Sequence, residues 1–202
     1  MLLFLALGSQ FGASTNFAAS EKDAFDRRAV ALSRAFIAAE LARHAPLSRV
    51  VYPGQDLALD LRACLVAAGA QYPSRLGIGI RPDCGTWFAV RAAVATTLHE
   101  SHERIVRELY PPLPPSDGGP CHTCADAPCR GACPVRAIET TLNLDVCIAQ
   151  RLREHSPCEF RCGAREACPV GREFMYPRHQ IEYHYGVSLT MIRRWSAKVT
   201  GS

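Results

Sequence analysis

The sequence predicts an α+β fold followed by a cysteine-rich module and a helical tail. Helical and strand patterns alternate over residues 1–110, a proline- and glycine-rich stretch follows at 111–120, and eight of the ten cysteines fall within 121–171. The remaining residues, 172–202, carry aromatic and histidine side chains at helical spacing. This composition predicts an α+β body, a stiff linker, a compact module and a C-terminal helix that packs back on the rest of the chain.

The elements of the body are predicted from the spacing of its apolar residues. In order, they are a strand at 2–7, a helix at 21–44, a strand at 49–52, a helix at 56–70, and strands at 76–80 and 86–97 joined by a turn at 82–85. Ser20 is suited to cap the first helix, Pro46 closes it, and Gly69 ends the second helix. This order predicts helices packed on one layer of sheet.

The cysteines of the module form two runs, each of which ends in Cys-Pro. The first run is Cys121-x2-Cys124-x4-Cys129-x3-Cys133-Pro134, and the second is Cys147, then Cys158-x3-Cys162-x5-Cys168-Pro169. Four thiolates that end in Cys-Pro, present twice, are typical of a protein that holds two [4Fe–4S] clusters. Some gaps are longer than the usual Cys-x2-Cys-x2-Cys-x3-Cys spacing, but the number of ligands is unchanged.

The spacing also predicts which cysteines share a cluster. Short loops wrap three corners of a cubane, so the fourth thiolate comes from a more distant part of the chain. In two-cluster ferredoxins, the cysteine before proline in each run binds the other cluster. The first cysteine set is therefore Cys121, Cys124, Cys129 and Cys168. The second cysteine set is Cys133, Cys147, Cys158 and Cys162.

Two other interpretations of eight cysteines stay open, namely four disulfides or two structural zinc sites. Disulfides need an oxidising compartment, whereas the apolar start at 2–7 is short and lacks the positive charge of a signal peptide, so we expect a cytoplasmic protein. Zinc knuckles favour paired Cys-x2-Cys units, and only Cys121 and Cys124 have this spacing. Cys-Pro endings have no role in such a knuckle.

Composition limits the partners of the chain. The net charge is +4 in 202 residues and no block of like charge occurs, so we expect no nucleic-acid binding. No apolar stretch approaches the ~18–20 residues of a membrane span. Metal-bound thiolates are anionic, so we interpret the basic residues as counter-charges around the clusters. The expected partner is a redox protein.

The surroundings of the cysteines resemble a known family. Cys147, isolated within 143–148 ahead of three further cysteines, is similar to the arrangement in epoxyqueuosine reductase and the reductive dehalogenases. The stretch 76–88 resembles the strand–turn–strand that precedes the clusters in those enzymes. Residues 120–129 and 167–171 resemble a group of short bacterial ferredoxin-like proteins.

This resemblance implies a nitroreductase-like α+β body that exchanges electrons with the two clusters, and it leaves open whether this body binds cobalamin or flavin. By position, it implies Asp56 as the candidate catalytic acid, with Asp60 equally close; both also suit a helix N-terminus or an exposed surface. An apolar cleft near a cluster would then hold the cofactor, with Trp87 as its expected wall.

Three further side chains stand out. His122 lies inside the first cysteine run, where we expect it to tune a cluster by hydrogen bonding or solvation rather than to bind iron. Cys64 falls among apolar residues of a predicted helix and is expected to be a buried small hydrophobe. Cys84 lies in a turn beside Gly85, so it is the better candidate for a reactive thiol, although an inert free cysteine is the simpler interpretation.

Two classes of function follow. In one, the protein is an electron carrier or the electron-transfer subunit of a reductase, and the body shields the clusters and binds partners. In the other, the body binds its own cofactor and the protein is itself a reductase. The sequence favours the carrier, because it shows eight cluster ligands but no clear catalytic acid, base or phosphate-binding loop. A zinc-stabilised structural module is the third alternative.

Overall fold

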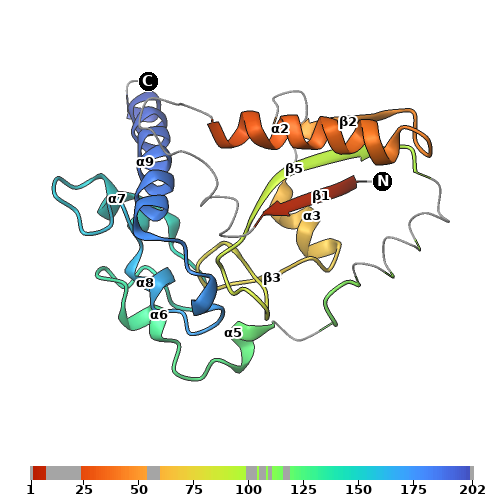
Figure 1. The fold of residues 1–202 in the computed structure, drawn as a ribbon. Helices are drawn as coiled ribbons and strands as arrows, with labels where there is room; N and C mark the ends of the chain where they lie inside the picture. Colours follow the sequence, from red (N-terminus) through yellow and green to blue (C-terminus); the bar gives the residue numbers. More distant parts are fainter. Residues whose placement is uncertain are drawn as a thin grey trace. The chain divides into compact units, whose positions relative to one another are not determined.

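The computed structural model describes residues 2–7, 24–53, 60–98, 104, 108, 111–115 and 119–200 (Figure 1). The chain divides into two compact units. Residues 1–70 and 88–115 form the first unit, and residues 71–87 and 116–202 form the second unit.

The first unit is a three-stranded antiparallel sheet with a long helix packed on it. Its elements are β1 (Leu2–Leu7), α2 (Ala24–Phe36), the π-helix η1 (Ile37–Leu41), β2 (Ser48–Tyr52), α3 (Leu61–Ala67) and β5 (Ala89–Thr96). The strand order is β1-β5-β2, so β5 is the central strand. Ala92, Ala93 and Val94 of β5 are almost fully buried, and α2 packs on β5 and β2 (Figure 1). Small side chains on the central strand let the helix approach closely.

The helices of this unit end close to where the sequence predicts. The helix predicted at 21–44 is observed from Ala24 and continues into η1, after which the Leu41 carbonyl accepts the N–H of Ala45 at 2.7 Å. In α3, the Asp60 carboxylate caps the helix by accepting the N–H of Ala63 at 3.0 Å. Asp60 therefore has the structural role of an N-cap.

The second unit contains a two-stranded hairpin and several short helices before one long helix. Its elements are β3 (Tyr72–Pro73), β4 (Gly79–Ile80), α5 (Pro120–Thr123), α6 (Pro128–Gly131), α7 (Leu144–Leu152), α8 (Gly163–Glu166), the 3₁₀-helix η2 (Arg172–Phe174) and α9 (Arg178–Thr200). Its buried cluster consists of Trp87, Tyr176 and Ile181, with Tyr185 packed against it. The C-terminal helix α9 packs against α7, so the tail belongs to this unit.

The structure corrects the sequence prediction for residues 71–87, which were placed in the body. The strand predicted at 76–80 is reduced to β4, because the Ser74 hydroxyl donates to the Ile78 carbonyl at 2.7 Å and holds a turn. The strand predicted at 86–97 begins only at Ala89. Thr86 and Trp87 belong to the second unit, where Arg165 contacts both of them.

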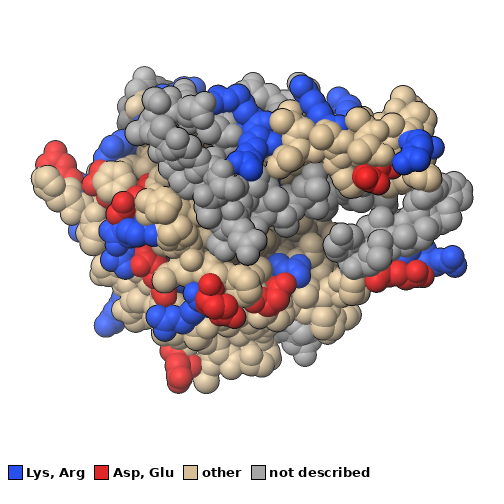
Figure 2. Space-filling model, in the orientation of Figure 1, with Lys and Arg blue, Asp and Glu red and all other residues tan. Residues whose placement is uncertain are grey.

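The described residues thus combine helices with small antiparallel sheets, and a nitroreductase-like arrangement stays a prediction. Within the described ranges, no helix is long and apolar enough to cross a membrane. On the face drawn in Figure 2, acidic and basic side chains of the second unit lie intermingled.

Candidate metal centre

The first cysteine set is assembled from three short segments of the second unit. Cys121 lies in α5, Cys124 is the residue after its end, and Cys129 lies in α6. Cys168 follows α8 and is buried, with its N–H donating to the Arg165 carbonyl at 3.2 Å. Both α5 and α6 begin with proline, which suits the first turn of a helix because it needs no N–H partner there.

The second cysteine set is assembled around α7. Cys147 lies in the first turns of this helix, whose N-cap Asn143 accepts the N–H of Val146 at 3.2 Å. Cys158 donates its N–H to the Ser156 hydroxyl at 3.2 Å, and Cys162 is the N-cap residue of α8. The remaining member, Cys133, follows α6.

Two helices connect the two sets. Cys129 of the first set and Cys133 of the second set flank the end of α6, while Cys162 of the second set and Cys168 of the first set flank α8. The two helices pack against each other. Each helix therefore leads from a member of one set to a member of the other.

Each set borders its own hollow. One hollow, about 400 Å³ including its opening to solvent, is lined by all four cysteines of the first set and by no member of the second. The other, about 1220 Å³ by the same measure, is lined by all four cysteines of the second set and by none of the first. Leu76 lines both hollows, so they are neighbours within the second unit. All ten cysteines of the chain are free thiols.

The thiols of a set affect each other electrostatically. Burial raises the pKa of the Cys129 thiol, and the charges of the other three thiols of the first set raise it further. Burial also raises the pKa of the Cys147 thiol, and the other three thiols of the second set act in the same direction. Four thiolates so close together repel one another, and bound cations relieve this repulsion.

Backbone N–H groups stabilise the two cysteines that precede proline. The N–H of Ala137 donates to the Sγ atom of Cys133 at 3.3 Å. At Cys168, burial raises the thiol pKa, whereas a hydrogen bond from the backbone of Val170 lowers it. Hydrogen bonds of this kind to cluster sulfurs tune the reduction potential. Both cysteines stand in the repeated sequence Ala-Cys-Pro-Val, a signal of internal symmetry that the cysteine spacing alone did not use.

Two glycines hold the loop after Cys168 against the turn at 82–85. Gly85 has φ +61° and a Cβ placed on it would overlap the Val170 carbonyl; Gly171 has φ +67° and its Cβ would overlap the backbone of Cys84 and Gly85. Only glycine combines a positive φ with so close an approach of two backbones. The turn from the early part of the chain therefore supports the first cysteine set.

Arginine side chains lie beside both sets, and the sequence prediction did not assign them individually. Arg75 lines the first hollow, and its Nη2 donates to the Cys121 carbonyl at 3.2 Å. Arg151 and Arg165 line the second hollow. For Arg151 a signal was available, because it follows Cys147 by four residues and so lies on the same face of the helix.

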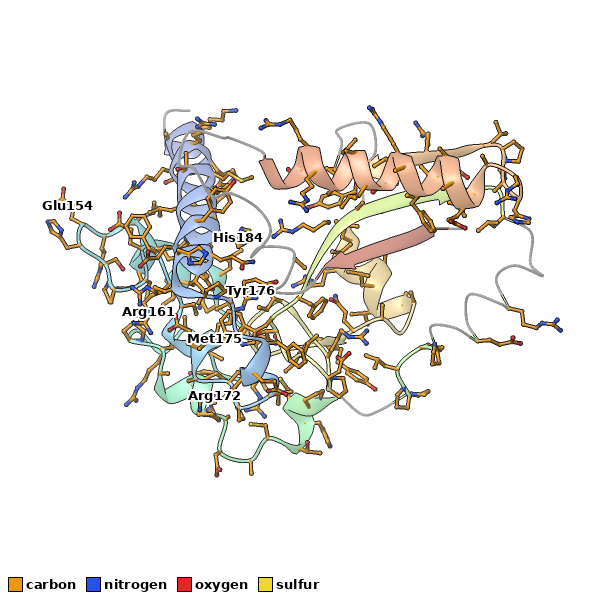
Figure 3. All side chains as sticks on the ribbon, viewed as in Figure 1. Glu154, Arg161, Arg172, Met175, Tyr176 and His184 are labelled. Atoms are coloured by element: carbon orange, nitrogen blue, oxygen red, sulfur yellow. The ribbon has the colours of Figure 1, made fainter. Side chains whose placement is uncertain are left out.

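Trp87, the expected wall of a cofactor cleft, lies in the core of the second unit. It is 1% exposed, lines neither hollow, and packs edge-to-face on Tyr176 with ring centroids 5.5 Å apart. The Arg165 guanidinium lies over its ring at 4.3 Å from the centroid. Tyr176 and His184 lie close together near the start of α9, with ring centroids 6.0 Å apart (Figure 3). The expected cleft around Trp87 is thus filled by the core of the second unit.

The remaining residues singled out from the sequence are Asp56, His122, Cys64 and Cys84. Asp56 lies outside the described residues. His122 is exposed and lines neither hollow. Cys64 is only half-buried on α3, so the expectation of a buried position was wrong. Burial, followed by the charge of Asp83, raises the pKa of Cys84 to about 11, which favours an inert thiol at neutral pH.

Within the described residues, which include every cysteine, no three His, Cys, Asp or Glu side chains gather closely enough to hold a single metal ion. Four thiolates on one zinc ion converge on one point. In a cubane each thiolate binds a different iron atom, so the sulfurs stay farther apart. The four thiols that line each hollow supply the number of ligands that either arrangement needs.

Comparison of the chain with protein-family models, with curated proteins and with solved structures gives no significant match. The case for the site depends on the chain's own residues.

Proposed function

We propose that this protein binds two [4Fe–4S] clusters and transfers electrons, one cluster on each cysteine set. The observation that supports this most strongly is the division of eight free thiols between two neighbouring hollows, four to each, in the crossed order of two-cluster ferredoxins. The donors at each hollow are sulfur atoms, which suit iron–sulfur clusters.

The clusters would supply one-electron chemistry, and the chain would supply ligands, shielding and charge. The backbone N–H groups of Ala137 and Val170 stabilise thiolate charge, and arginines beside each set compensate it. Reduced thiols in this number suit a reducing compartment, for which we propose the cytoplasm. A redox protein is the proposed partner.

The test is the metal content of the full chain prepared anaerobically. We expect about eight iron and eight sulfide per chain, with a broad visible absorbance that dithionite bleaches. Cys158→Ser should lower the iron content, whereas Cys64→Ser, which changes a cysteine outside both sets, should leave it unchanged. Stoichiometric zinc without a visible chromophore would contradict the proposal and support the zinc-stabilised module.

A second candidate is a reductase with a cofactor of its own, cobalamin or flavin. The larger hollow favours it, because apolar side chains such as Ile78, Ile138 and Leu142 extend its wall beyond the second cysteine set. Titration of cobalamin or flavin into cluster-loaded protein tests this. Saturable binding with a spectral change that Leu142→Arg abolishes would favour the reductase, and no binding would favour the carrier.

A further inference from the structure

Arg151 is a buried cation without an anionic partner in the described protein. Its side chain is on α7, one turn after Cys147, and the residue is 8% exposed. It donates three hydrogen bonds, to the Cys158 carbonyl at 3.3 Å, the Ser188 hydroxyl at 3.0 Å and the Tyr185 carbonyl at 2.9 Å. All three acceptors are neutral, and no described carboxylate forms an ion pair with it.

Burying a guanidinium costs free energy unless a negative charge compensates it, because the group cannot lose its proton. The candidate anions nearby are the thiols of the second set. Arg151 lines the same hollow as these four thiols, and its Nε donates to the backbone carbonyl of one of them, Cys158. Metal-bound thiolates would therefore provide the counter-charge that Arg151 lacks.

The positive charge is not shared equally between the two sets. The second hollow is also lined by Arg165, whose hydrogen bonds go to the hydroxyl and carbonyl of Thr86, again neutral groups. Arg161 lines it too, but Glu166 neutralises this side chain in an ion pair. The first hollow has one arginine, Arg75, which is only half-buried. A buried charge acts more strongly than an exposed one, because less water screens it.

We propose that Arg151, assisted by Arg165, gives the second cluster the higher reduction potential, so that electrons pass from the first cluster to the second. This inference rests on the proposed function. Reduction adds one negative charge to a cluster, and nearby positive charge stabilises the reduced form. In the transfer, the first cluster loses one electron and the second gains it; no proton moves, since the guanidinium stays charged.

The test is an anaerobic redox titration of the full chain, followed by EPR. Cys121→Ser and Cys158→Ser, each of which alters one set, assign the signals to the clusters. In the unsubstituted protein, the second cluster should be reduced first. Arg151→Met should shift the electron-sharing equilibrium between the clusters toward the first by about tenfold or more, equal to about 59 mV for a one-electron couple.

Three variants serve as controls. Arg75→Met should lower the potential of the first cluster and widen the gap. Arg153→Met, at an exposed arginine two residues after Arg151, should change neither potential. Arg151→Lys keeps the charge and should retain most of the gap.

Reduction of the first cluster before the second in the unsubstituted protein would overturn the inference. So would an unchanged gap in Arg151→Met. If Arg151→Met fails to assemble its second cluster, two results still test the inference. They are the order in which the two clusters of the unsubstituted protein are reduced and the potential of the first cluster in Arg75→Met. Absence of iron in the unsubstituted protein would instead contradict the proposed function.

Discussion

Replacing Gly171 with alanine tests whether the turn at 82–85 supports the first cysteine set. Gly171 lies three residues after Cys168 and has φ +67°. A Cβ atom there would come within 3.0 Å of the backbone of Cys84 and Gly85, closer than real Cβ atoms approach other atoms. Because the obstacle is backbone on both sides, rotation of a side chain cannot relieve it.

The expected loss of stability has two parts. A left-handed backbone costs an alanine about 1–2 kcal/mol. The forced displacement of a packed segment costs about 1–3 kcal/mol more. Together these give roughly 2–5 kcal/mol, a large fraction of the stability of an ordinary domain. The displaced segment carries Cys168, so the first cluster should be lost before the second.

An anaerobic urea titration, followed by cluster absorbance and EPR, measures this effect. Gly131→Ala is the matched control, because its Cβ would meet nothing within 4 Å. The control should be neutral or slightly stabilising, by up to about 1 kcal/mol. If both variants have the same iron content and urea midpoint, the argument that the two glycines hold the loop in place is wrong.

Three further predictions concern the thiols. Cys129→Ala and Cys133→Ala should disturb different EPR signals although the residues are four apart, and a shared signal would mean that each run binds its own cluster. In iron-free protein, hydrogen exchange should be fast over 119–171 while β5 stays protected; equal protection would show that the module folds without metal. The pKa of Cys84 is raised from 9.0 to about 11, so at pH 8 its thiol should react with iodoacetamide about a hundredfold more slowly than an ordinary thiol. The rate should rise as the pH approaches 11. Reaction at an ordinary rate would show that the thiol is not shielded.

The division of the cysteines between the two hollows follows the order predicted from their spacing. Spacing is local information, and the Cys-Pro endings limit where each loop leads. The strands β1 and β2 were equally accessible, since their apolar pattern lies in a few neighbouring residues. The second helix was predicted from residue 56, whereas α3 begins at Leu61 with Asp60 as its N-cap. Whether the thiols bind clusters stays a prediction.

Long-range contacts explain what the sequence prediction missed. Thr86 and Trp87 continue an apolar strand pattern, yet their partner Arg165 lies 79 residues away from Thr86 in the chain. The spacing of Arg151 from Cys147 gave a signal for its position near the thiols, but its burial depends on α9, which supplies Ser188. Neither relationship leaves a periodic signal, because each joins single residues from distant segments.

The path of residues 71–87 has a consequence for dividing the chain. The proline-rich stretch at 111–115 looks like a natural place to cut, but a fragment that begins there lacks Arg75, the turn at 82–85 and Trp87. The cysteines would remain, without the glycine contact at Gly85 and without the aromatic ring under Arg165. Such a fragment would have every cysteine ligand but would lack residues 71–87, which belong to the same compact unit as the cysteines.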